Sequence, residues 1–152
     1  MTRVLAGQVK NIRIVMGNKN QKIRVAQKAM ILNENENILT MRRSETAPSR
    51  PLQWDLPGGD LEFGEDAKAG ILREIKEETG LEIKDLSVVD IASGMNDINQ
   101  FWLTICYIAR PKTNQVVLSY EHDDFKWVTP DEFQQLRASP RNKAFIERFK
   151  TL

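Results

Sequence analysis

The alternation of hydrophobic and polar positions predicts strands over the first third of the chain. Residues 9–16 alternate loosely, and residues 24–32 and 38–42 have the apolar and β-branched composition of two further strands. Between them, residues 33–37 read Asn-Glu-Asn-Glu-Asn, a run of turn formers that predicts a hairpin loop. Residues 44–53 carry two prolines and no apolar period, so they are expected to form a surface loop.

The clearest helical pattern lies between Asp66 and Gly80. Aspartate caps helix N-termini, and glycine adopts the left-handed conformation that often ends a helix. At about 100° per residue, Ala67, Ile71 and Ile75 form one apolar stripe. A helix with one buried face is therefore predicted between these two end residues.

The second half of the chain predicts more strands and two helices. Strands are expected at residues 88–92, 101–109, 116–118 and 125–128. A helix opens at Thr129 with Pro130 at its first position, and residues 142–150 form a terminal helix with one apolar face. This order predicts an α+β fold, an α/β/α sandwich around a mixed β-sheet, in a single domain over residues 1–152.

Composition narrows the classes of partner and compartment. The chain has 22 basic and 21 acidic residues and a net charge of +1, so no broad field favours nucleic acid or an anionic membrane, and neither partner is expected. No apolar run approaches the roughly 18 residues of a membrane span. Cys106 is the only cysteine, which excludes an intrachain disulfide and fits a reducing compartment. A cytoplasmic protein is expected.

Carboxylates gather on the predicted helix after residue 66. Glu74 and Glu78 are four residues apart and stack beside the apolar stripe, and Glu77 lies one step to the side. Carboxylates crowded near a buried edge repel one another and resist ionising. A hard divalent cation such as Mg²⁺ relieves that conflict. Glu65 enters from the loop side and Gly70 leaves room for a close approach, so the arrangement predicts a metal site.

A solvated helix face is the competing interpretation of these glutamates. For residues 74–78 alone it is favoured at roughly three to one. The full spacing from Gly59 to Leu81 favours the metal site instead. With average residue usage, the probability of matching its nine constrained positions somewhere in this chain by chance is on the order of 10⁻⁷.

Residues 59–81 resemble the Nudix box at every defining position. Gly59 is followed by Glu65 and then by the run Arg-Glu-Ile-Lys-Glu-Glu-Thr-Gly-Leu at 73–81, and the preceding Leu-Pro-Gly-Gly is also typical of that family. The resemblance implies a Nudix fold. It also implies a hydrolase that uses Mg²⁺, with Mn²⁺ as a substitute, to cut a diphosphate linkage in a small nucleotide substrate by attack of water at phosphorus.

The resemblance also implies which residues hold the metal. Glu74, Glu77 and Glu78 are expected to bind Mg²⁺, and Glu65 to support or share a metal ion. Gly59 is expected to supply a backbone conformation and a carbonyl directed at the metal.

Four residues are the candidates for catalysis: Glu74, Arg73, Glu78 and Glu121. Glu74 or a more distant acid would orient or deprotonate the attacking water, and Arg73 would hold the carboxylates with its planar fork. Glu121 lies in an acidic loop where related enzymes often place a further ligand or base. An exposed loop acid is an equally good interpretation of Glu121.

Other conspicuous side chains favour structural roles. Cys106 is expected to fill the core, and His122, the only histidine, to be solvated. Trp102 and Phe101 could stack on a base, but core packing is the favoured interpretation, as it is for Trp54. The three arginines that flank the loop at 44–53 either grip phosphates or form solvated surface: Arg42, Arg43 and Arg50.

The substrate is inferred by elimination. Some Nudix subgroups, which act on ADP-ribose or dinucleoside polyphosphates, carry a proline or tyrosine roughly 15 to 18 residues beyond the box. This chain reads Asn-Asp-Ile-Asn at 96–99, so both marks are absent. A nucleoside triphosphate pyrophosphatase is therefore the default, with an ADP-ribose or nucleotide-sugar pyrophosphatase as the alternative. A non-catalytic nucleotide-sensing module and an isoprenoid diphosphate isomerase are alternatives from other classes. The segment before Lys22 could pair with a second subunit in a homodimer.

Overall fold

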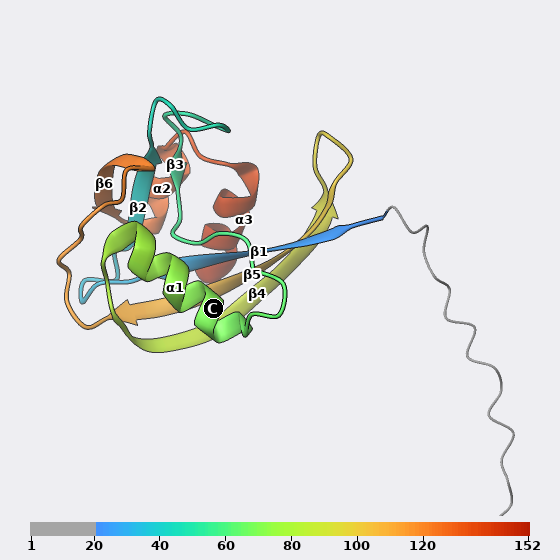
Figure 1. Cartoon of the computed structure of the whole chain (residues 1–152). Helices are drawn as coiled ribbons and strands as arrows, with labels where there is room; N and C mark the ends of the chain where they lie inside the picture. Colours follow the sequence, from blue (N-terminus) through green and yellow to red (C-terminus); the bar gives the residue numbers. More distant parts are fainter. Residues whose placement is uncertain (1–20) are drawn as a thin grey trace, which may run out of the picture.

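The computed structural model describes residues 21–152. Its elements are, in order, β1 (Ile23–Ile31), β2 (Ile38–Arg43), β3 (Trp54–Asp55), α1 (Ala67–Thr79), β4 (Ile83–Met95), β5 (Phe101–Pro111), β6 (His122–Val128), α2 (Pro130–Gln135) and α3 (Pro140–Phe149) (Figure 1). The strands form two three-stranded sheets, in the orders β1-β5-β4 and β3-β2-β6. The first sheet is mixed, because β1 is parallel to β5 and β4 is antiparallel to it. The second sheet is antiparallel throughout.

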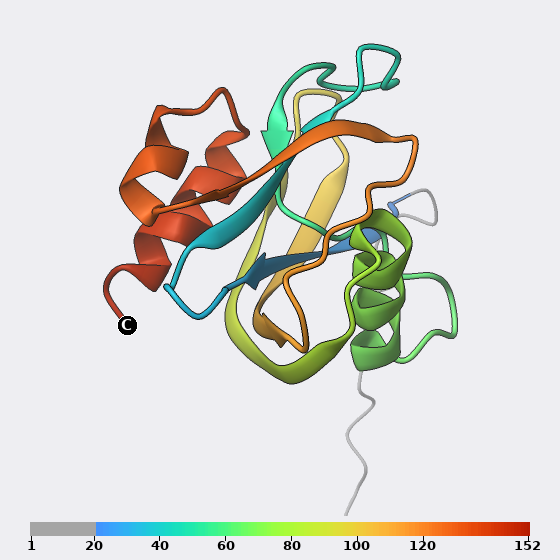
Figure 2. The ribbon, with the colours of Figure 1, turned by 90° about the vertical axis from the view of Figure 1, so that its left-hand side faces the viewer.

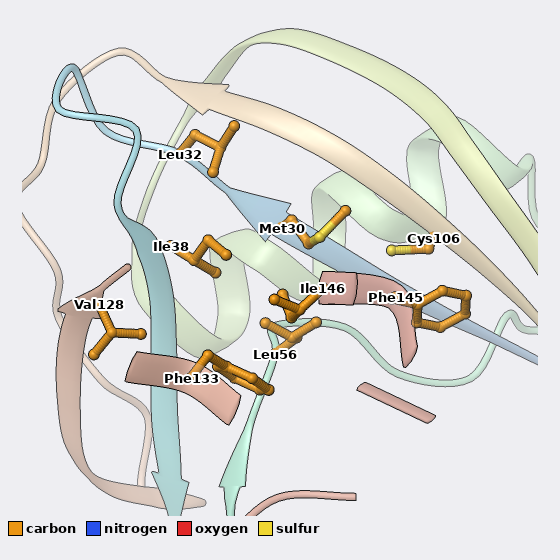
Figure 3. Packing of buried hydrophobic residues seen from close by; sticks show 9 residues of the cluster. All are labelled: Met30, Leu32, Ile38, Leu56, Cys106, Val128, Phe133, Phe145 and Ile146. Carbon is orange, nitrogen blue, oxygen red and sulfur yellow. The ribbon is translucent and has the colours of Figure 1, made fainter. Parts of the chain in front are cut away.

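Helices cover both sides of the strands, as expected for an α/β/α sandwich. Figure 2 shows α1 on one side and the α2–α3 pair on the other. Alternate residues of β1 serve the two layers: Ala29 and Ile31 pack in the cluster that contains Ile71 and Ile75 of α1. Met30 instead joins the cluster formed with α2 and α3, which is drawn in Figure 3. The two-residue period of a strand thus builds two cores from one segment.

The caps of α1 follow the sequence prediction. The Asp66 carboxylate accepts a hydrogen bond from the Ala69 N–H at 3.0 Å. Gly80 has φ 70°, and its N–H donates to the Lys76 carbonyl. Such an N-cap stabilises a helix by about 1 kcal/mol, so the glutamates of α1 lie on a helix that is capped at both ends. In the described part of the chain, no helix is both long and apolar enough to cross a membrane.

Several predicted boundaries change in the structure. β4 is longer than the predicted 88–92 because it pairs with β5 along its whole length. The strand predicted at 116–118 is wrong: the Val117 and Ser119 N–H groups donate to the carbonyls of Thr79 and Glu78 at the end of α1. β3 was not predicted, and α3 begins at Pro140, not at residue 142, because Ser139 is its cap. The strand predicted at 9–16 lies outside the described residues.

The segment at 57–61 runs along the edge of β1 and carries α1 toward the sheet. The Ala29 N–H donates to the Pro57 carbonyl and the Gln27 N–H to the Gly59 carbonyl, both at 2.8 Å. Gly58 has φ 142°, and a Cβ there would lie 2.0 Å from the Gln27 carbonyl oxygen. Only glycine therefore permits this approach, which sets residues 58–59 between β1 and α1.

Candidate functional site

Arg73 contacts three of the predicted glutamates at once. Its Nε and one terminal nitrogen donate to the two oxygens of Glu65, at 2.7 and 3.1 Å. The other terminal nitrogen donates to Glu74 at 3.0 Å and to Glu77 at 3.2 Å. The hydrogen bond to Arg73 is the main cause that lowers the pKa of Glu65. The guanidinium therefore arranges the acidic face of α1.

The Glu74 carboxylate lies directly against Gly59. A Cβ on Gly59 would meet the Glu74 carboxylate at 2.7 Å, so this position has space for a metal ligand only because it has no side chain. Burial raises the pKa of Glu74, with smaller contributions from the charges of Glu77 and Glu121, while Arg73 opposes the shift.

Glu78 is the most buried acid of the helix, with 7% of its surface exposed. The Gly58 N–H donates to one of its oxygens at 3.1 Å. Burial raises the pKa of Glu78 to about 8, although Lys28 and the Gly58 N–H oppose the shift. Glu74 and Glu78 thus both resist ionising, as predicted, but the main cause is burial and the repulsion between neighbouring carboxylates contributes less.

Gly70 and Gln27 join α1 to the sheet. A Cβ on Gly70 would come within 2.9 Å of the Gln27 side-chain oxygen and 3.0 Å of the Glu65 carboxyl carbon, so the close approach expected there is present. The buried Gln27 amide donates to the Ala67 carbonyl at 2.7 Å and to the Tyr107 hydroxyl at 2.8 Å. These bonds hold the start of α1 in register with β1.

Glu121 lies in the loop that leads into β6 and is exposed. Its carbonyl accepts a hydrogen bond from the Ser44 N–H at 2.9 Å. Two residues earlier, the Ser119 N–H donates to the Glu78 carbonyl at 3.2 Å, so the structure brings this loop, which lies outside the box, beside α1. Its role as a base or ligand stays a prediction.

The metal-binding roles also stay predictions. Across residues 21–152, no three acidic, histidine or cysteine side chains stand in position to enclose an ion. Arg73 engages Glu65, Glu74 and Glu77, and a backbone N–H engages Glu78. The donors are nevertheless all carboxylate oxygens, which suit a hard divalent cation. The Gly59 carbonyl already accepts the Gln27 N–H.

A cleft of about 400 Å³ adjoins these glutamates on the other side of Gly58 and Gly59. Its floor includes Ala26 and Lys28 of β1 and Trp102 of β5. The end of β2, the loop at 44–53, the β4–β5 turn and the start of α3 supply the walls through Arg43, Arg50, Asn96, Gln100, Arg141 and Asn142. A concave, basic and polar cavity of this size beside an acidic helix can hold a phosphorylated small molecule.

Asp55 anchors the floor of this cleft. Its carboxylate accepts hydrogen bonds from the Lys28 ammonium at 2.8 Å, the Asn142 amide at 2.7 Å and the Arg43 guanidinium at 3.3 Å. Burial opposes ionisation of Asp55, but Lys28 with the other donors lowers its pKa to about 2. A stable buried anion therefore links β1, β2 and α3 at one point on β3.

The structure corrects some predicted side-chain roles. His122 is buried, not solvated, and burial lowers its pKa to about 4. Trp102 lines the cleft and Phe101 is 37% exposed, so core packing was wrong for both. Trp54 is buried as predicted.

Cys106 is also buried as predicted, and burial raises its pKa to about 12. The thiolate that an isomerase would require is therefore not accessible.

The arginines beside the loop differ from one another: Arg42 pairs with Asp123 at 2.7 Å, and Arg43 with Asp55.

Sequence reasoning missed four residues around the cleft: Lys28, Asp55, Arg141 and Asn142. Lys28 offered a signal, because a charged residue interrupts an apolar strand. The others are brought together only by tertiary structure.

Comparison with known proteins identifies the family. The NUDIX domain family model matches residues 22–149. This chain belongs to the NUDIX family. A putative 8-oxo-dGTP diphosphatase 2 of Mycobacterium tuberculosis is 50% identical over 94 residues, which are 62% of this chain and 66% of that protein. The CTP pyrophosphohydrolase of Escherichia coli is 25% identical over 82% of this chain and 90% of its own.

Solved structures agree with the Nudix fold. The MutT protein of Methanosarcina mazei superposes with a TM-score of 0.76 and 28% identity, over 88% of this chain and 97% of that one. The chain is thus a MutT-like Nudix hydrolase that acts on phosphorus-containing anhydrides. Nudix hydrolases use divalent metal ions and bind small nucleotide substrates.

Proposed function

We propose that this Nudix hydrolase is a Mg²⁺-dependent nucleoside triphosphate pyrophosphatase that releases a nucleoside monophosphate and pyrophosphate. The observation that carries the proposal is the cleft of about 400 Å³ that meets the acidic helix at Gly58 and Gly59. Lys28, Arg43 and Arg141 line it, so a polyanionic substrate would enter a basic cavity with its phosphates beside the glutamates. Two relatives named for triphosphate substrates support this class.

Mg²⁺ would be held by Glu74, Glu77 and Glu78, with Glu65 supporting or sharing a metal ion. The buried carboxyl of Glu78 and the space above Gly59 support this assignment, because a divalent cation would offset the burial that now disfavours ionisation. Bound Mg²⁺ supplies charge neutralisation of the phosphate oxygens and lowers the pKa of a water molecule.

The protein groups then position the reactants. Arg73 keeps Glu65 and Glu74 in fixed orientations, so that little rearrangement accompanies the reaction. Glu74, whose raised pKa favours proton uptake, or the nearby Glu121 accepts the proton of the attacking water. Lys28 is fixed by Asp55 and the Leu56 carbonyl at the cleft floor.

The test is a panel of nucleoside triphosphates, ADP-ribose and dinucleoside polyphosphates assayed with Mg²⁺ for release of pyrophosphate and phosphate. Glu74→Gln and Glu78→Gln should abolish turnover while the proteins remain folded. Glu34→Gln is the matched control, since Glu34 is an exposed acid in the hairpin loop after β1. Inertness toward every triphosphate would refute the substrate class, and near wild-type hydrolysis by the two helix variants would refute the site.

A further inference from the structure

Two arginines meet in the cleft without an acidic partner. Arg50 and Arg141 both line it. Among the described residues neither forms an ion pair, and the first 20 residues contain no Asp or Glu. Burial, followed by the charge of Arg50, lowers the pKa of Arg141. Two like charges are thus held near each other with hydrogen-bond donors unused.

Arg141 is held in position by its neighbours, whereas the exposed Arg50 has no side-chain hydrogen bond among the described residues. One terminal nitrogen of Arg141 donates to the buried Thr104 hydroxyl at 2.9 Å, and its guanidinium lies 5.9 Å from the Trp102 ring centroid. Arg50 has φ 49°, a left-handed conformation that is costly for a residue with a side chain. Arg50 also lines a small gap with Ser139 and Asn142, which places it beside the first turn of α3. Strain of this kind is concentrated at ligand-binding positions.

The place of this pair in the sheet indicates which part of a substrate it meets. Gly59 borders β1 on one side, and β5 pairs with β1 on the other, with Trp102 opposite Arg24. Two strand spacings, about 10 Å, therefore separate the segment that faces Glu74 from the strand that carries Trp102. If the diphosphate lies at the glutamates, as the proposed function requires, the nucleoside lies toward Arg141.

A guanidinium is a donor-only group with a planar fork, so it pairs best with two adjacent acceptors. Guanine presents O6 and N7 in this way, and cytosine presents O2 and N3. Adenine places its N6 amino donor beside N7 and N1, and uracil places the donor N3–H between its two carbonyl oxygens, so neither base offers two adjacent acceptors on these edges. We propose that Arg50 and Arg141 determine base specificity by binding the paired acceptors of guanine or cytosine, an inference that rests on the proposed function.

The experiment compares kcat/KM for GTP, CTP, ATP and UTP. The wild-type protein should prefer GTP and CTP by roughly 10- to 100-fold, the range expected for a bidentate contact. Arg141→Gln and Arg50→Gln should remove that preference, because they should raise KM for GTP and CTP roughly 10- to 100-fold more than KM for ATP and UTP. Arg148→Gln, at an exposed position of the same helix, is the control.

Two further measurements separate the alternatives. Arg141→Lys keeps the charge but not the fork, so it should also lose the preference; full retention would overturn the proposal, as would an equal loss for all four nucleotides. Calorimetric binding of GMP, CMP, AMP and UMP in EDTA does not depend on hydrolysis. A GMP or CMP preference that Arg141→Gln removes would sustain the inference even if no triphosphate were cleaved, and equal binding of all four would refute it.

Discussion

The buried carboxyl of Glu78 should make the metal-free protein less stable as the pH rises. Its pKa in the folded protein is about 8, against an ordinary value of 4.5. Because the folded state binds this proton more tightly than the unfolded state, stability falls as pH rises from about 4.5 and the loss is complete above about 8. At about 1.4 kcal/mol per pKa unit, the loss is about 5 kcal/mol at high pH and about 3 kcal/mol at pH 7.

Glu78→Gln removes the titration and keeps the size of the side chain. The variant should match the wild-type protein near pH 4.5 and exceed its free energy of unfolding by about 3 kcal/mol at pH 7 in EDTA. Urea unfolding followed by tryptophan fluorescence at pH 5, 7 and 8.5 measures the difference, in which the titrating groups remote from Glu78 cancel. A difference that does not grow with pH would refute the reasoning. Glu34→Gln should show no pH-dependent difference.

The remaining predictions test the other features of the site. Gly59→Ala should lower turnover on the order of 100-fold with little loss of stability, because the added Cβ meets the movable end of the Glu74 side chain. Gly58→Ala should destabilise the protein by more than about 2 kcal/mol, because its Cβ meets backbone atoms. Equal melting temperatures for the two variants would contradict this prediction. Asp55→Ala should lower the free energy of unfolding in urea by about 3–5 kcal/mol, because it leaves Lys28 and Arg43 without their buried anion. A loss below about 1 kcal/mol would contradict this prediction, because it would mean that water solvates the two cations in the variant. Cys106, with its pKa raised to about 12, should react with a thiol reagent only as fast as the protein unfolds; rapid labelling of the native protein would contradict its burial.

The elements with a strong local signal were predictable from the sequence. The two caps and the apolar stripe of α1 predict a helix, and the long apolar runs of β1 and β5 predict strands. The acidic face of α1 follows from the same periodicity. The stretch at 116–118 has strand composition, but its backbone groups bond to the end of α1, a competition that no local pattern reveals. β3 is too short to have a period.

The cleft was less predictable than the acidic helix because its residues come from distant parts of the chain. Asp55 and Asn142 are 87 positions apart, yet their side chains meet at 2.7 Å. Trp102 lies in an apolar strand with buried residues further along it, so the sequence favours burial of its side chain, yet this side chain lines the cleft. His122 follows a polar loop and is nevertheless buried. Periodicity identifies the face of a side chain but not what covers it.

The contacts of Asp55 have a consequence for how the protein is made. A nascent chain that has emerged only as far as α2 already holds Asp55 and Lys28, but it lacks the amide of Asn142 that completes the anion's hydrogen bonds. The floor of the cavity therefore closes only when α3 has left the ribosome. Translation arrested before that point should yield both sheets with a water-exposed Asp55, so docking of α3 and assembly of the cleft should occur as a single event.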